Sequence, residues 1–165
     1  MRLALDRPDR LARLVGCDFN AASSAANTAA WRDRVALADE DGGHGIRHLA
    51  RQTVARWFHP ASLDRRPDLV AWLTDMLAAN DVAGFRHACT ALWDYDMRPD
   101  MPACAVPALL VVGEVDAKGA LVDAMAAFRP LLGSAGAELK VVPGVGHLPM
   151  VEDPDAFWAT ISHFL

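Results

Sequence analysis

Hydrophobic residues recur along this chain with two different spacings, which divide it into three stretches. Near the N-terminus, residues 11–17 form a short, largely apolar run that ends at Asp18, as expected for a strand of a parallel sheet. From residue 28 to residue 93, apolar residues repeat every three or four positions, which predicts helices. Two apolar runs, 106–113 and 138–142, then follow, and each precedes a helical pattern. The chain therefore reads as strand, helices, then strand and helix in alternation.

The helical stretch contains four predicted helices. They cover residues 28–39, 46–58, 67–77 and 82–93. The glycine-rich segment 41–45 separates the first two, because glycine favours backbone conformations outside the helix. Four helices inserted between two strands predict a cap subdomain. Within it we expect Trp72 and Trp93 to be core residues.

Alternation of strand and helix resumes after the cap. Pro107 stands near the start of its strand, where no ladder donor is needed. Asp153-Pro154 suits the cap and first turn of a last helix that ends near Phe164. This order predicts an α/β fold with a parallel sheet flanked by helices. The expected domains are a partial α/β core, residues 1–23 and 101–165, and a helical cap, residues 24–100.

Composition narrows the class of protein further. Of the 165 residues, 53% are hydrophobic and 22% are charged, as in globular proteins. The net charge of −5 argues against nucleic acid as a partner, because phosphate binding needs a clustered basic surface. Neither a membrane span nor a signal peptide is recognisable, which predicts a cytoplasmic protein without a membrane partner. Cys17, Cys89 and Cys104 form no CxxC pair, so we expect free thiols, and no metal or cofactor.

Two polar residues follow the C-terminal strands. Asp116 comes directly after the strand 106–113, and His147 follows the strand 138–142 through a glycine-rich turn. In open α/β sheets, functional side chains lie beyond the C-terminal ends of strands. An acid followed by a histidine on successive strand ends is the order of the last two members of a serine-hydrolase triad. We interpret Asp116 as the acid and His147 as the base of such a triad.

The surrounding residues carry a resemblance to a known family. Pro107-Ala-Leu-Leu-Val-Val-Gly-Glu-Val-Asp116 and Gly146-His-Leu-Pro-Met-Val-Glu-Asp-Pro154 resemble the paired C-terminal motifs of the α/β-hydrolase superfamily. Further stretches at 7–15, 55–60 and 81–92 make the chain most similar to 3-oxoadipate enol-lactonases. The resemblance implies the C-terminal part of a hydrolase that cleaves a small ester or lactone. It also implies that Asp116 and His147 are the triad acid and base.

The nucleophile of that family is not recognisable in this sequence. It lies in Gly-x-Ser-x-Gly on a strand-to-helix turn, whereas Leu132-Gly-Ser-Ala-Gly136 lacks the first glycine and follows a helix. We interpret Ser134 as a loop serine, and Ser23 and Ser24 also lack this context. By the resemblance, Met1 aligns just after the nucleophile. Three accounts follow: a hydrolase without its N-terminal half, a subunit completed by a chain that carries the serine, or a non-catalytic binding protein.

Residues of the predicted cap and of the loops supply the remaining candidates. Trp31 and Trp57 are expected to line a substrate pocket, as aromatic residues do around small apolar ligands. No arginine precedes Trp31 in the loop that starts at Asp18, although a substrate carboxylate would favour a cation there. Asp18, also at a strand end, is expected to cap a loop rather than to serve as a substitute acid or a substrate contact, and Glu152 is expected to support the start of the final helix.

Overall fold

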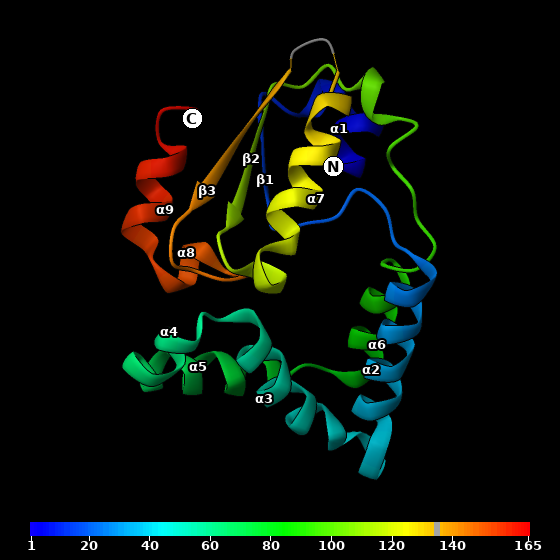
Figure 1. Cartoon of the computed structure of the whole chain (residues 1–165). Helices are drawn as coiled ribbons and strands as arrows, with labels where there is room; N and C mark the ends of the chain where they lie inside the picture. The colour runs from blue at the N-terminus through cyan, green and yellow to red at the C-terminus, as the bar shows by residue number, and fades with distance from the viewer. Residues whose placement is uncertain (134–135) are drawn as a thin grey trace. The chain divides into compact units, whose positions relative to one another are not determined.

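The computed structural model describes residues 1–133 and 136–165. It divides into two compact units. One unit, here called the α/β unit, joins Met1–Ala21 with Asp96–Leu165, and the other, the helical unit, is Ala22–Tyr95. All the strands in the described residues belong to the α/β unit (Figure 1).

The α/β unit holds three strands and four α-helices among its described residues. The strands are β1 (Leu14–Cys17), β2 (Ala108–Gly113) and β3 (Ala137–Val142); the helices are α1 (Arg2–Asp6), α7 (Ala120–Phe128), α8 (Pro149–Glu152) and α9 (Pro154–Ile161). The predicted order of strands and helices is thus confirmed. Asp153 caps α9 by accepting a hydrogen bond from the N–H of Ala156 at 2.9 Å, as its place before Pro154 suggested.

The three strands form a parallel sheet in the order β1-β2-β3. Strand β2 lies in the middle, and all six of its residues are buried. Strand β1 is only half-buried and starts at Leu14 rather than at Leu11 as predicted. A 3-10 turn at Pro8–Arg10 precedes it, and pairing with β2 begins where Leu14 lies opposite Ala108. Strand β3 alternates between partly buried and exposed residues from Ala137 to Lys140, as an outer strand does, and ends at the buried Val142.

Successive residues of β2 point to opposite faces of the sheet, and each face has its own apolar cluster. Leu110 and Val112 pack in the cluster that contains Met125 of α7. Leu109 and Val111 pack with Ile161 of α9 on the other face. Figure 1 shows α7 and α9 on opposite sides of the sheet. A continuous apolar run is therefore needed in β2, because both of its faces are covered by helices.

This packing makes the centre of β2 sensitive to loss of volume. We expect Leu110→Ala to lower the free energy of unfolding by roughly 2–5 kcal/mol, because the fully buried side chain leaves a cavity that neighbours fill only partly. Val141→Ala in β3 is the control, since Val141 is 43% exposed, and we expect it to change stability by less than about 1 kcal/mol. Urea unfolding of the intact chain measures both, and equal losses would contradict the assignment of β2 as the core strand.

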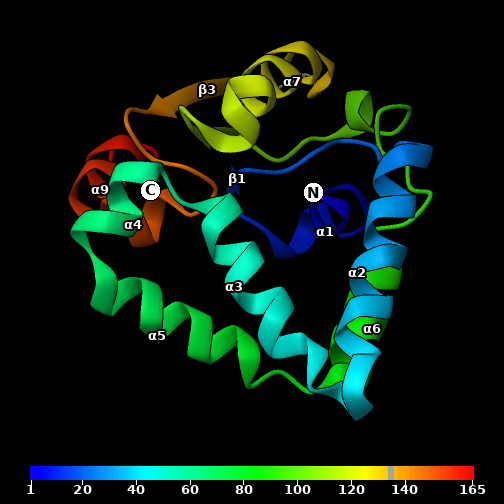
Figure 2. The same ribbon diagram turned by 60° about the horizontal axis from the view of Figure 1, so that its bottom comes forward.

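The helical unit is built from five helices among its described residues. These are α2 (Ala25–Gly43), α3 (Gly45–Trp57), α4 (Pro60–Arg65), α5 (Pro67–Ala78) and α6 (Val82–Thr90). Helix α2 packs against α3 and α6, and α3 packs against α5 (Figure 2). The structure adds the short helix α4 to the four that were predicted. Its first turn starts at Pro60, and the Nδ1 atom of His59 accepts a hydrogen bond from the N–H of Ala61 at 3.0 Å.

Two tryptophans of the helical unit differ from their predicted burial. Trp72 in α5 is 53% exposed, so its assignment to the core is wrong. Leu73 is the buried residue of α5 and points inward. Trp72, the residue before it, points outward because adjacent residues in a helix do not share a face. Trp93 is half-buried, with the Arg32 guanidinium 5.2 Å from its ring centroid.

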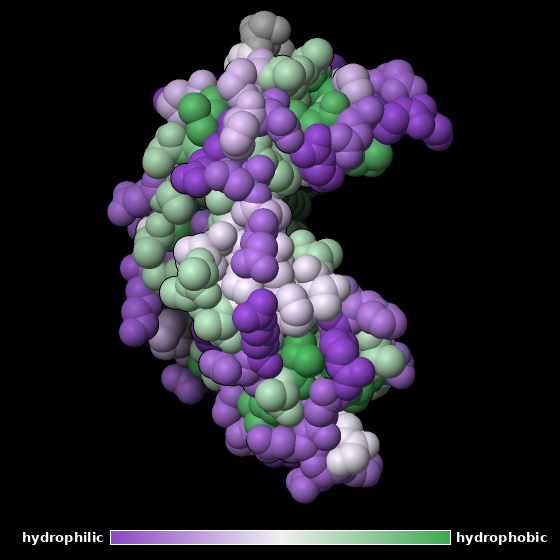
Figure 3. All heavy atoms as spheres, turned by 90° about the vertical axis from the view of Figure 1, so that its right-hand side faces the viewer, coloured by the Kyte–Doolittle hydropathy of each residue, from purple (hydrophilic) through white to green (hydrophobic). Residues whose placement is uncertain are grey.

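On the face shown in Figure 3, hydrophilic residues are mixed with smaller groups of hydrophobic residues, as on the surface of many folded proteins. Across residues 1–133 and 136–165, no helix combines the length and the apolar character needed to cross a bilayer.

Candidate active site

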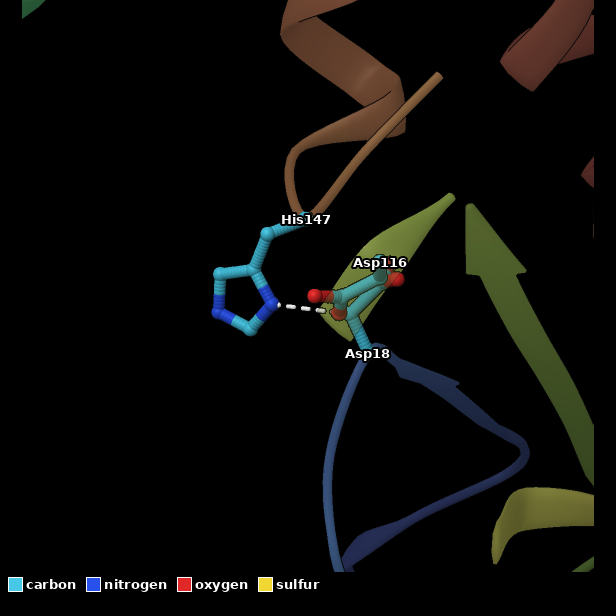
Figure 4. A group of neighbouring side chains, drawn as sticks. All are labelled: Asp18, Asp116 and His147. Carbon is cyan, nitrogen blue, oxygen red and sulfur yellow. Dashed lines mark hydrogen bonds and ion pairs between the residues drawn. The ribbon is translucent and has the colours of Figure 1, made fainter. Parts of the chain in front are cut away.

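Within the α/β unit, a polar residue follows each strand of the sheet, either directly or after a short turn. Asp18 directly follows β1, Asp116 lies three residues beyond the end of β2, and His147 follows β3 after a turn. Because the strands are parallel, their C-terminal ends meet at one edge of the sheet. The three side chains converge there, as Figure 4 shows. The structure thus brings together Asp116 and His147, the two residues predicted as acid and base.

A short hydrogen bond joins the predicted acid and base. His147 Nδ1 lies 2.7 Å from Asp116 Oδ2. The Asp116 carboxylate is buried, whereas the imidazole remains about one third exposed. The second ring nitrogen points away from both carboxyl groups (Figure 4). An imidazole held in this way donates from Nδ1 to the carboxylate and presents Nε2 as a proton acceptor.

The loop that carries His147 is fixed to the end of β2 and to α8. The N–H of Val115 donates to the carbonyl of Val145 at 3.1 Å, which extends the β2–β3 pairing past the strand ends. The N–H of Gly146 donates to Glu152 Oε2 at 2.5 Å. Glu152 therefore anchors the histidine loop, whereas Asp153 caps the final helix. Sequence reasoning missed this role, because the contact depends on how α8 folds back on the loop.

Close packing between β2 and the histidine loop requires a glycine at position 113. A Cβ atom at Gly113 would lie 1.9 Å from the carbonyl oxygen of Gly146 and 2.7 Å from that of Val145. Both are backbone atoms that no rotamer change can move away. Gly113 thus sets the distance between the strand that leads to Asp116 and the loop that bears His147.

Asp18 takes part in this site and is not a local loop cap, so that expectation is wrong. Its Oδ1 accepts a hydrogen bond at 2.8 Å from the N–H of Gly113, which lies 95 residues further along the chain. Asp18 is only 7% exposed and has a positive φ of 45°. The pKa of Asp18 is raised to about 7, chiefly because burial disfavours the charged form. The Asp116 carboxylate acts in the same direction, whereas the Gly113 N–H and His147 oppose it.

The same trio has the ligand types of a metal site. One ligand atom each from Asp18, Asp116 and His147 lies within 4.8 Å of the others. Carboxylates and imidazole suit several divalent cations. In this arrangement, however, the hydrogen bond to Asp116 engages His147 Nδ1, the ring nitrogen that faces the carboxyl groups. The geometry therefore matches an acid–histidine pair more closely than a set of metal ligands.

The two tryptophans predicted to bind substrate line one pocket of the helical unit. This pocket has a volume of about 180 Å³ and mostly apolar walls, including Leu49, Phe85 and Leu92. Trp31 comes from α2 and Trp57 from the end of α3. Arg34 and Arg56 also line it, and the Arg34 guanidinium lies 4.5 Å from the ring centroid of Trp31. Sequence reasoning missed both arginines, although Arg34 follows Trp31 at the i+3 spacing of one helix face.

The serines weighed as nucleophiles have other roles where the structure describes them. Ser24 caps α2, its Oγ accepting a hydrogen bond from the N–H of Asn27 at 3.1 Å. Ser23 Oγ lies 3.3 Å from Thr28 Oγ1 and accepts from Asn27 Nδ2 at 3.1 Å. Ser134, interpreted as a loop serine, lies outside the described residues.

Comparison with known proteins shows that this chain is similar to enzymes. No family model matches the chain. It is 28% identical over 155 residues to 3-oxoadipate enol-lactonase 2 of Acinetobacter baylyi, covering 94% of this chain and 55% of the relative. The crystal structure of the enol-lactonase from Burkholderia xenovorans LB400 matches with a TM-score of 0.81 and 27% identity, over 98% of this chain and 59% of that one. The crystal structure of a hydrolase from Pseudomonas aeruginosa PA01 matches with a TM-score of 0.81 and 30% identity. The match covers 99% of this chain and 58% of that one.

The chain has the fold of the α/β-hydrolases, and its partial coverage of these proteins is consistent with their C-terminal portion. Its homologues are 3-oxoadipate enol-lactonases and other hydrolases. The chain spans about half the length of the curated relatives it matches.

Proposed function

We propose that this chain supplies the general base and its orienting acid for the hydrolysis of a small ester or lactone by a serine nucleophile. The observation that carries the proposal is the 2.7 Å contact between His147 Nδ1 and buried Asp116 at neighbouring strand ends. The enol-lactonase and hydrolase relatives support the same class of reaction.

In the proposed reaction, His147 Nε2 takes the proton from the serine hydroxyl as the oxygen attacks the substrate carbonyl. It then gives that proton to the leaving oxygen as the ester or lactone bond breaks, which leaves an acyl-enzyme. Water, activated by the same nitrogen, attacks the acyl carbonyl and releases the acid. Asp116 keeps the proton on Nδ1 and stabilises the imidazolium while it is charged. No cofactor is needed for these steps.

The test of this proposal concerns the nucleophile. The sequence in frame upstream of Met1 and any adjacent gene are searched for Gly-x-Ser-x-Gly, and the longer chain or the pair of chains is assayed with 4-nitrophenyl acetate and a small lactone. We expect turnover that a serine-directed sulfonyl fluoride abolishes. If neither form turns over either substrate while the helical unit still binds small apolar molecules, the chain is a binding protein and the proposal is wrong.

We further propose that Trp31 and Trp57 bind the apolar part of the substrate. Arg34 and Arg56 also line this pocket, and arginine there suits a substrate that carries a carboxylate. Burial of an apolar group in such a pocket stabilises the complex by about 25 cal/mol per Å² removed from water.

Trp57→Ala should raise KM in the active form by about 10-fold with a smaller change in kcat, because it removes binding shared by substrate and transition state. Trp72→Ala is the matched control, since Trp72 is exposed and is not among the residues that line this pocket. Steady-state kinetics with a small ester measures both variants, and equal KM values for the two would contradict the assignment of the pocket.

A further inference from the structure

Two buried carboxyl groups lie side by side at the candidate active site, although the proposed reaction uses only one. Asp18 and Asp116 are each 7% exposed. One carboxyl oxygen of each and one ring nitrogen of His147 all lie within 4.8 Å of one another. Two carboxylates this close and this poorly hydrated cannot both ionise without a large electrostatic cost, so such pairs hold a proton. The imidazole hydrogen bond belongs to Asp116, which makes Asp18 the carboxyl that keeps the proton.

The hydrogen bonds of Asp18 agree with this assignment. Its Oδ1 accepts a hydrogen bond from the N–H of Gly113, so Oδ2 is the oxygen whose partner has to be identified. That oxygen is fully buried, and no donor in the described residues is directed at it. A buried acceptor without a donor is costly, but a protonated oxygen becomes a donor itself. Asp116, the neighbouring carboxylate, is the acceptor available to it.

We propose that Asp18 is a positioning residue that acts through Asp116: protonated on Oδ2, it donates a hydrogen bond to the Asp116 carboxylate and fixes that carboxylate against His147. Its Oδ1 meanwhile ties the end of β1 to Gly113, from which the chain runs to Asp116. Asp18 thus holds both the side chain of Asp116 and the strand end that carries it. The catalytic consequence rests on the proposed function, whereas the protonation and the hydrogen bond are properties of this chain alone.

This arrangement makes the site depend on pH. The titratable groups that act on Asp18 are Asp116, which raises its pKa, and His147, which lowers it; the adjacent thiol of Cys17 has its own pKa raised by burial and by Asp18. Below about pH 7 Asp18 is neutral and donates to Asp116. As the pH rises through that value, Asp18 ionises, the donor is lost, and a second negative charge appears beside Asp116.

The effect on stability has a definite sign. An aspartate in the unfolded chain titrates near pH 4, as a rough reference value. Between that pH and the pKa of about 7 in the fold, the folded state holds a proton that the unfolded state has released. Stability contributed by Asp18 is therefore present at low pH and declines as the pH rises across this window.

The first experiment needs no substitution and no catalytic activity. Carboxyl ¹³C NMR of the intact chain should show Asp18 titrating near pH 7, about three units above an ordinary aspartate. A single Asp18 transition near pH 4 would overturn the proposal.

A matched pair of variants tests the contact itself. Asp18→Asn is close to isosteric and permanently neutral, with an amide that can accept from Gly113 and donate to Asp116. It should flatten the decline in stability between pH 5 and pH 8. Asp123→Asn, on the exposed side of α7, should leave this decline unchanged. If Asp18→Asn behaves like Asp123→Asn, the proposal is wrong.

These results can be separated from those of the proposed function. An Asp18 transition near pH 7, together with a decline in stability that Asp18→Asn removes, supports the positioning role even if no serine nucleophile is found for this chain. Conversely, confirmed hydrolysis through His147, together with a fully ionised Asp18 at pH 6, would support the function and overturn the positioning role.

Discussion

We expect His147→Ala to lower kcat for ester or lactone hydrolysis by at least about 10³-fold in the active form of the protein, because the serine hydroxyl then has no base to take its proton. KM should change little, since the imidazole acts mainly in the transition state. The measurement is steady-state hydrolysis of 4-nitrophenyl acetate by wild type and variant in parallel.

His163→Ala provides the control for this substitution. His163 follows α9 in the same unit and is exposed, so its loss should leave kcat within about 2-fold of wild type, as for most surface substitutions. Circular dichroism and the unfolding midpoint establish whether both variants remain folded. Retained turnover in a folded His147→Ala variant would show that His147 is not the base.

A second large effect is expected at a residue without a side chain. Gly113→Ala should lower activity by about 10²-fold or more, because the added methyl group would lie 1.9 Å from the Gly146 carbonyl oxygen and must push the histidine loop away. In the chain by itself, the downfield ¹H NMR signal of the His147 Nδ1 proton should broaden or disappear as the 2.7 Å contact with Asp116 is lost.

Gly84→Ala is the matched control for that change. Gly84 lies inside α6, where a Cβ atom would meet only the side chain of Asp81, at 3.2 Å or more. Alanine is favoured over glycine in a helix by up to about 1 kcal/mol, so this variant should remain folded with its His147 signal intact. An unchanged His147 signal in Gly113→Ala would mean that the loop adapts and that Gly113 does not set the geometry of the site.

The amino-acid sequence by itself determined the order of strands and helices and the two polar residues at the C-terminal strand ends. The fully buried β2 follows from an unbroken apolar run, and α9 starts where Asp153 and Pro154 stand. Such features depend on neighbours within a few positions, because local backbone preferences and side-chain periodicity act over that range. Asp116 and His147 could be singled out for the same reason, since each follows a strand closely.

The tertiary structure decided what depends on contacts between distant residues. Asp18 joins the site through Gly113, and Glu152 reaches back to Gly146. The outward position of Trp72 and the shared pocket of Trp31 and Trp57 depend on how the helices of one unit pack. No local pattern encodes these features, because the same residue serves as a loop cap, a surface group or a buried partner according to what the folded chain brings beside it.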